Sequence, residues 1–404
     1  MDWRLTSLDL FTLNMTIKGA WIYRDAPDFI RMKAALEELA EMYPHLGGRY
    51  CEQTKSVRWE DGKAADLPFT SCDLRSHTVD ELIGNSSIWS LVRPYDTNAF
   101  KKGSVSPFSA VLGYLKDGAV LFMQCAHATM DGATFYALAG QWAALYKGEP
   151  VSAMTVDQAL VPAPDSLSKE ETVRQVLEKG WLRIKAGQLI RMLWNLGRNN
   201  RIKTTHIIEI SQEQIADLKK ASGAGTNAAL TALAMKAFSE HAVREKSYRL
   251  LFVADLRSRF TGIDDTFFGN LSQPVVADGM FSPNEDLPSL AAGIDSSLKE
   301  ALVSGRAEEN VRLSQCSSHY GLPYFYFDAS DMNCPDPGTI YINNQLKFRA
   351  CELDWGTGLP AYAFPNELID MVKFWQPVSA GPVQLIFGGL ASKIMERPVR
   401  VAGK

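Results

Sequence analysis

Helix-like and strand-like hydrophobic patterns alternate along the first half of the chain. Residues 28–43 place apolar side chains at helical spacing and end at Pro44, which predicts an amphipathic helix. Residues 109–126 contain two short apolar runs, SAVLGYL and AVLFMQCA, separated by KDG, and this arrangement predicts a strand hairpin. Residues 133–146 return to helical spacing. The first half therefore reads as an α/β unit.

A second series of the same kind begins near residue 205. The predicted order is a strand at 205–211, helices at 212–221 and 227–243, a strand at 250–256, a helix at 286–302 and strand-like runs that include 346–353 and 382–389. Two α/β halves joined by a crossover are the expected architecture.

The segment between the halves has its own character. Residues 149–168 contain three prolines and little periodicity, which is typical of an interdomain connection. Residues 169–197 predict one long amphipathic helix with a basic face, either packed on the protein or lying on a membrane surface or as a lid. We therefore divide the chain into domains 1–165 and 205–404, with a crossover at 166–204.

Composition supports a globular, two-domain protein. The chain has 404 residues, of which 46% are hydrophobic and 22% charged, a balance typical of well-cored proteins. A net charge of −4 gives no basic surplus for nucleic acid. The sequence shows no signal peptide and no apolar run long enough for a transmembrane segment, so we expect a cytoplasmic protein. We also expect it to be a monomer.

The strongest candidate for chemistry is CAHATMDGATF, residues 125–135. His127 follows a predicted strand, and an imidazole can take a proton near neutral pH. Asp131 could orient that imidazole, cap the following helix or form a structural ion pair. Gly132 would allow close approach of a ligand or a backbone. A hydrogen-bonded core histidine is the alternative interpretation of His127.

Other kinds of site find little support in the sequence. The six cysteines are scattered without a C-x-x-C pair, and no second histidine accompanies the first in its segment, so we expect neither disulfides nor a metal site. Phosphate-loop, dinucleotide and nucleophile-elbow motifs are absent. Direct attack by the acceptor is therefore favoured over a covalent enzyme intermediate.

Six segments in order resemble the BAHD family of coenzyme A-dependent acyltransferases, known from secondary metabolism. They are LTSLDL near the start, MKAALEELAEMYPHLGGRY at 32–50, the H-x-x-x-D-G motif HATMDG, TNAALTALAMKAF at 226–238, ADLRSRF followed by FFGNLSQPV, and DWGTG at 354–358. The chain is a divergent member, because the family's D-F-G-W-G reads DWGTG here and its "TSW" segment falls on Asn343-Asn344-Gln345.

The resemblance implies a fold and a reaction. The fold is two chloramphenicol acetyltransferase-like domains, each a mixed β-sheet flanked by helices, with a channel between them and residues 352–371 crossing back to the first domain. The reaction transfers an acyl group from acyl-coenzyme A, a substrate and not a bound cofactor, to a hydroxyl or amine of a small-molecule acceptor.

The resemblance also assigns residue roles. His127 is the general base. Asp131 and Gly132 support it, and Asp131 pairs with Arg257. The remaining assignments are Asp354, Gly356 and Gly358 as structural residues, Asn343 and Gln345 at the oxyanion or acceptor, and Thr226 and Arg259 at coenzyme A.

Two alternatives remain open. A condensation-type domain shares the H-x-x-x-D-G core but uses carrier-protein thioesters, and such domains usually carry a second histidine where this chain has Ala126. A catalytically inactive binding protein of the same fold is the other alternative, and the intact His127 and Gly132 argue against it.

Overall fold

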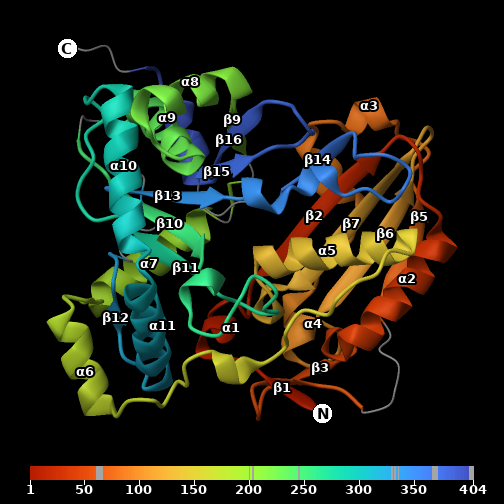
Figure 1. Cartoon of the computed structure of the whole chain (residues 1–404), viewed down its shortest axis with the longest axis horizontal. Helices are drawn as coiled ribbons and strands as arrows, with labels where there is room; N and C mark the ends of the chain where they lie inside the picture. Colours follow the sequence, from red (N-terminus) through yellow and green to blue (C-terminus); the bar gives the residue numbers. More distant parts are fainter. Residues whose placement is uncertain are drawn as a thin grey trace.

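The computed structural model places two mixed sheets side by side, each with helices packed against it (Figure 1). It describes residues 1–60, 67–199, 201–202, 204–243, 246–328, 331, 334, 336–365 and 372–399.

The N-terminal sheet has five strands in the order β14-β2-β7-β6-β5, and only the β6–β5 pair is parallel. The strands are β14 (Tyr362–Phe364), β2 (Thr16–Tyr23), β7 (Ala119–Ala126), β6 (Phe108–Tyr114) and β5 (Phe69–Asp73). The sequence-predicted hairpin is the β6–β7 pair.

Helices α2 (Phe29–Met42) and α5 (Gly132–Lys147) pack on one face of this sheet. The other face packs against α3 (Val79–Leu82) and the following turn. A small sheet of β1 (Asp2–Arg4), β4 (Ser56–Arg58) and β3 (Arg49–Cys51) lies near the N-terminus, with the short helices α1 (Ser7–Phe11) and α4 (Thr97–Lys101) beside it.

The C-terminal sheet has six strands in the order β11-β10-β13-β15-β16-β9. They are β11 (Ser272–Val276), β10 (Arg249–Asp255), β13 (Thr339–Asn344), β15 (Val372–Trp375), β16 (Val383–Gly388) and β9 (Thr205–Ile210). Helices α8 (Gln212–Ser222), α9 (Thr226–Glu240), α10 (Leu287–Ala301) and α12 (Leu390–Met395) bury one face in the second core.

The other face of that sheet meets the first half of the molecule. Side chains alternate along a strand, so Phe374 enters the C-terminal core whereas Trp375 and Ile386 belong to the N-terminal core. The strand β14 goes further, because it follows β13 in the chain but pairs antiparallel with β2 of the N-terminal sheet.

One sequence prediction is wrong in this half, and one helix was not predicted. Residues 346–353 form two 3-10 turns, Leu346–Phe348 and Ala350–Glu352, instead of a strand, with Arg349 between them at φ 48°. Residues 304–319, which we did not predict as helical, form α11 (Ser304–His319), followed by the short strand β12 (Tyr324–Phe325).

The crossover also differs from the single helix predicted over 169–197. It consists of α6 (Lys169–Glu178), the short strand β8 (Leu182–Arg183) and α7 (Ala186–Asn199). Gly180 interrupts the helix with φ 70°, a left-handed conformation that favours glycine and ends helices. Figure 1 shows α6 at the lower left edge of the C-terminal half.

Candidate active site

His127 lies directly after strand β7, where it begins the 3-10 turn His127–Thr129. Both of its backbone groups are bound: its N–H donates to the Met15 carbonyl at 3.0 Å, and its C=O accepts from Asn270 Nδ2 at 2.9 Å. Met15 precedes β2, and Asn270 precedes β11 of the other sheet. The two halves of the molecule therefore hold this residue between them.

His127 is partly exposed as a residue. Its Nδ1 is buried and has no hydrogen-bond partner among the described residues. Burial lowers the pKa of His127 below its ordinary value of 6.5, because desolvation disfavours the charged form. The ring is therefore neutral at physiological pH, which is the form that can accept a proton.

Asp131 is the N-cap of α5 and one partner of a buried ion pair. Its Oδ1 accepts from the Thr134 N–H at 3.1 Å, and both carboxylate oxygens accept from Arg257 at 2.9 Å. Oδ2 also accepts from the N–H groups of Leu271 and Ser272. With this set of donors, the carboxylate acts as a cap and ion-pair partner, and no hydrogen bond joins it to the His127 ring among the described contacts.

Arg257 comes from the C-terminal half and is 1% exposed. Its guanidinium also donates to Asp255 Oδ1 at 2.8 Å, to Thr134 Oγ1 at 2.8 Å and to the carbonyl oxygens of Phe267 and Gly269. Because these bonds use all of its donor groups, the buried charge is fully compensated. The pair connects the start of α5 to the loop before β11.

Gly132 faces an aromatic ring. A Cβ at this position would lie 2.8 Å from the ring of Phe348, which in turn stacks on Tyr136 at 5.1 Å between centroids. The side chain that requires a glycine here thus comes from the 3-10 turn after β13.

A buried contact between Asp9 and Asn270 was missed by sequence reasoning. Asn270 Nδ2 donates to Asp9 Oδ1 at 2.8 Å as well as to the His127 carbonyl, and Asp9 forms a capping box with Thr6. Burial raises the pKa of Asp9 to about 6. Both residues lie in segments that carry the family resemblance, LTSLDL and FFGNLSQPV, which was the available signal.

Asn343 and Gln345 lie at the end of β13. Asn343 alternates with Ile342, a residue of the C-terminal core, so it lies on the sheet face toward the other half. Gln345 is buried, and its Oε1 has no partner among the described residues. Asn344, between them, bonds Asn227 on α9 at 3.2 Å.

Thr226 and Arg259 occupy different elements. Thr226 is the first residue of α9, whose N-cap Gly225 provides no side-chain hydrogen bond. Arg259 is partly buried in the 3-10 turn Arg257–Arg259. Through Asn227, the start of α9 lies beside the end of β13, whereas among the described residues no hydrogen bond or ion pair joins the Arg259 side chain to that cluster.

The DWGTG segment forms a tight loop against the N-terminal core. Asp354 Oδ1 accepts from the N–H groups of Gly356 and Gly358, whose φ angles are 80° and 105°. Trp355 is buried, packs edge-on against Trp142 and donates to the Tyr23 hydroxyl at 3.0 Å. The predicted crossing over 352–371 includes residues 366–371, which lie outside the described residues.

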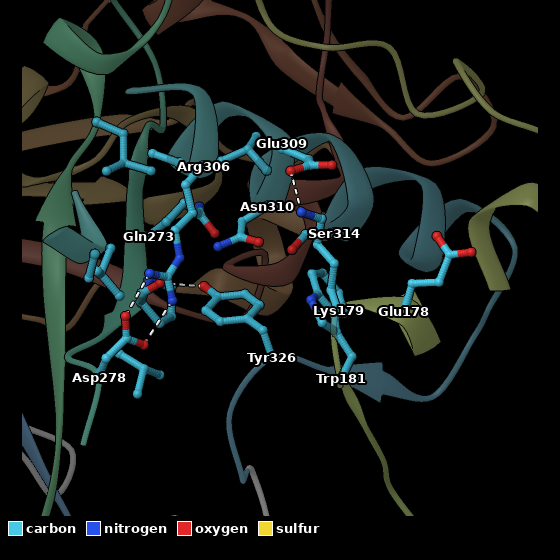
Figure 2. A pocket seen from close by; sticks show the side chains of 17 residues that line it. Glu178, Lys179, Trp181, Gln273, Asp278, Arg306, Glu309, Asn310, Ser314 and Tyr326 are labelled. Carbon is cyan, nitrogen blue, oxygen red and sulfur yellow. Dashed lines mark hydrogen bonds and ion pairs between the residues drawn. The ribbon is translucent and has the colours of Figure 1, made fainter. Parts of the chain in front are cut away.

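A cavity of about 690 Å³ opens beside this site between β11, α11 and the crossover (Figure 2). Its wall includes Leu256 and Gln273, the neighbours in sequence of Arg257 and Ser272, but not His127. Two ion pairs, Lys179–Glu309 and Arg306–Asp278, lie on its wall.

The residues that the structure describes hold no cluster of three or more His, Cys, Asp or Glu side chains placed to bind a metal ion. No helix among them combines the length and apolar composition of a membrane span.

Comparison with known proteins gives a family and a fold. A model of the Transferase family matches residues 2–368, whereas the search of curated proteins found no match. The structure of TRI101 of F. graminearum with coenzyme A and T-2 mycotoxin is similar at TM-score 0.74 and 14% identity, covering 97% of this chain and 96% of that one.

Two further structures have the same architecture. Vinorine synthase aligns at TM-score 0.67 and 15% identity, covering 97% of this chain and 91% of its own. The first condensation domain of the calcium-dependent antibiotic synthetase aligns at TM-score 0.60 and 14% identity, covering 96% and 91%. The expected fold of two chloramphenicol acetyltransferase-like domains is confirmed.

Proposed function

Since the chain belongs to the Transferase family of BAHD-type acyltransferases, we propose that it transfers an acyl group from acyl-coenzyme A to a hydroxyl or amine of a small molecule. The observation that carries this proposal is His127, which is neutral, partly exposed and held through its backbone by both halves. TRI101, similar in fold, is known in a complex with coenzyme A and T-2 mycotoxin.

The reaction follows from this placement. With Nδ1 buried, Nε2 of His127 takes the proton of the acceptor as its oxygen or nitrogen attacks the thioester carbonyl carbon. The carbon–sulfur bond of the tetrahedral intermediate then breaks. The leaving coenzyme A thiolate receives the proton from the imidazolium, which restores the base.

The intermediate needs hydrogen-bond donors for its oxyanion, and we assign Asn343 and Gln345 to that role or to the acceptor. Both lie at the end of β13, and Asn343 is on the sheet face toward the N-terminal half. A preorganised donor of this kind lowers the activation barrier by about 3 kcal/mol.

Coenzyme A carries phosphates, for which we assign Thr226 and Arg259. No side chain caps the first turn of α9 among the described residues, and helix N-termini attract anions. Arginine offers a planar donor set for phosphate. Asp354, Gly356 and Gly358 are assigned a structural role, because the carboxylate binds the two glycine N–H groups.

The test is thiol release from a panel of acyl-coenzyme A donors with the purified full chain. His127→Ala should lower kcat by about 10²–10⁴-fold, whereas the exposed His319→Ala should not. In the wild type, the acid limb of kcat/KM should lie below pH 6.5, since the lowered pKa keeps the ring neutral to a lower pH.

Two outcomes would reject the proposal. Equal rates for wild type and His127→Ala would show that the imidazole is not the base. Transfer from acyl-carrier protein but not from acyl-coenzyme A would instead support the condensation-type alternative, which shares the fold at TM-score 0.60.

A further inference from the structure

The crossover contains a long stretch without acidic residues. Residues 179–208 include seven lysines and arginines and no aspartate or glutamate, in a chain whose net charge is −4. Helix α7 (Ala186–Asn199) forms the middle of this stretch.

Helix α7 exposes large apolar side chains. Leu189, Ile190, Leu193 and Trp194, which we call the α7 apolar face, are 42%, 68%, 55% and 71% exposed. Single exposed apolar residues are common on protein surfaces. Four on adjacent turns of one helix indicate a contact that the isolated chain does not satisfy.

The side of α7 turned toward the protein is more polar than the exposed side. Gln188 and Met192 are partly buried and Asn195 is buried, where its Nδ2 lies 3.7 Å from Cys334 Sγ. At 3.6 residues per turn, these positions share one side of the helix and the α7 apolar face lies on the opposite side. An ordinary surface helix has the reverse arrangement.

The start of α7 is fastened to the protein by what precedes it. Strand β8 pairs with β12, the Ile184 N–H donates to the Pro323 carbonyl at 2.9 Å, and Trp181 is buried. Trp181 and Lys179 also line the cavity of about 690 Å³ (Figure 2). The helix therefore projects its apolar face from an anchored base close to that cavity.

We propose that α7 docks on an anionic membrane surface. The α7 apolar face enters the boundary between headgroups and acyl chains, and basic residues including Arg183, Lys185 and Arg198 contact lipid phosphates. An apolar stripe containing tryptophan, bordered by Lys and Arg, is the pattern of helices that lie in the interface plane.

Charge favours lipid over a second copy of the chain as the occupant. Two copies meeting through α7 would bring two stretches with a surplus of positive charge together, which costs free energy. Anionic lipid headgroups compensate the same charges, and each basic residue near the surface strengthens binding about fivefold.

The test is co-sedimentation of the full chain with vesicles of phosphatidylcholine alone or of an equimolar mixture with phosphatidylserine. The wild type should bind the mixed vesicles more tightly, and added salt should weaken that binding. Ile190→Glu should lower the partition coefficient about tenfold or more, and Arg198→Ala about fivefold.

Ile30→Glu is the matched control, because Ile30 is 72% exposed on α2, and it should bind like the wild type. Equal binding of Ile190→Glu and wild type would overturn the proposal. The proposal would also be overturned if the wild type failed to bind vesicles and light scattering showed a dimer that Ile190→Glu dissociates. Acyl transfer without vesicles should be equal in both proteins, so this test is independent of the proposed catalysis.

Discussion

At the scale of single residues, the site depends on the contact between a glycine, Gly132, and an aromatic ring, that of Phe348. Gly132 opens α5 beneath the Phe348 ring, and Tyr136 on the same helix stacks against that ring. The aromatic side chain comes from the second half of the chain. The size of one glycine therefore sets how closely the 3-10 turn after β13 approaches the H-x-x-x-D-G helix.

Gly132→Ala should lower the free energy of unfolding by about 1–3 kcal/mol, because overpacking forces the ring of Phe348 to move. Chemical denaturation of the purified variant measures this change. Gly140→Ala on the same helix is the matched control. Its Cβ would meet open space, so it should stabilise the protein by up to about 1 kcal/mol.

A second substitution makes this prediction sharper. Phe348→Leu in the Gly132→Ala background should recover part of the lost stability, since contacting residues couple in a double-mutant cycle. Purely additive effects of the two substitutions would contradict the assigned contact.

Sequence reasoning found the residues with a chemical motif but not those that hold them. His127, Asp131 and Arg257 stand in motifs whose order carries the resemblance, and the structure brings the last two together at 2.9 Å. The Asp9–Asn270 contact spans 261 positions. No local pattern specifies such a contact, because it exists only once both halves are folded.

At the scale of elements, helices and strands with clear periodicity were predicted well. The helix predicted at 28–43 is α2, although Ile30, one of the apolar residues in that range, is exposed. The pattern failed at 169–197, because the apolar residues continue at helical spacing across Gly180, which breaks the helix. It also failed at 346–353, where apolar residues fill turns that contact the other half.

The DWGTG loop before β14 contributes to stability through its buried tryptophan, Trp355. Trp355→Ala should reduce the free energy of unfolding by about 3–5 kcal/mol, as large buried aromatic residues do. The substitution leaves a cavity beside Trp142 and removes the bond to Tyr23. Thermal unfolding measures it, with Trp194→Ala as the exposed control. Equal melting temperatures for the two variants would show that the loop carries no stability.

At the scale of the whole molecule, the Asp131–Arg257 pair joins the two halves and makes stability depend on pH. Burial alone would raise the pKa of Asp131, but the attraction of Arg257 and the accepted hydrogen bonds outweigh it and hold the pKa below its ordinary value of 3.8. A depressed pKa stabilises the fold above about pH 4, and this contribution is lost as the pH falls through the folded-state pKa.

Asp131→Asn should therefore destabilise the protein by about 3–5 kcal/mol at pH 7, because it leaves the buried charge of Arg257 without its main partner. The difference from wild type should shrink as the pH is lowered below 4. Denaturant unfolding at several pH values measures it, and a difference that stays constant with pH would contradict the assignment.

The strand β14 has a consequence for dividing the protein. Strand β14 pairs with β2 although its residues follow β13. A fragment ending within the crossover would keep the H-x-x-x-D-G helix but lack β14 and Trp355. It would therefore expose the edge of β2 and leave an empty space beside Trp142. The complementary fragment carries both missing pieces. Separately expressed halves should each aggregate, and refolded together they should reassemble through that one exchanged strand.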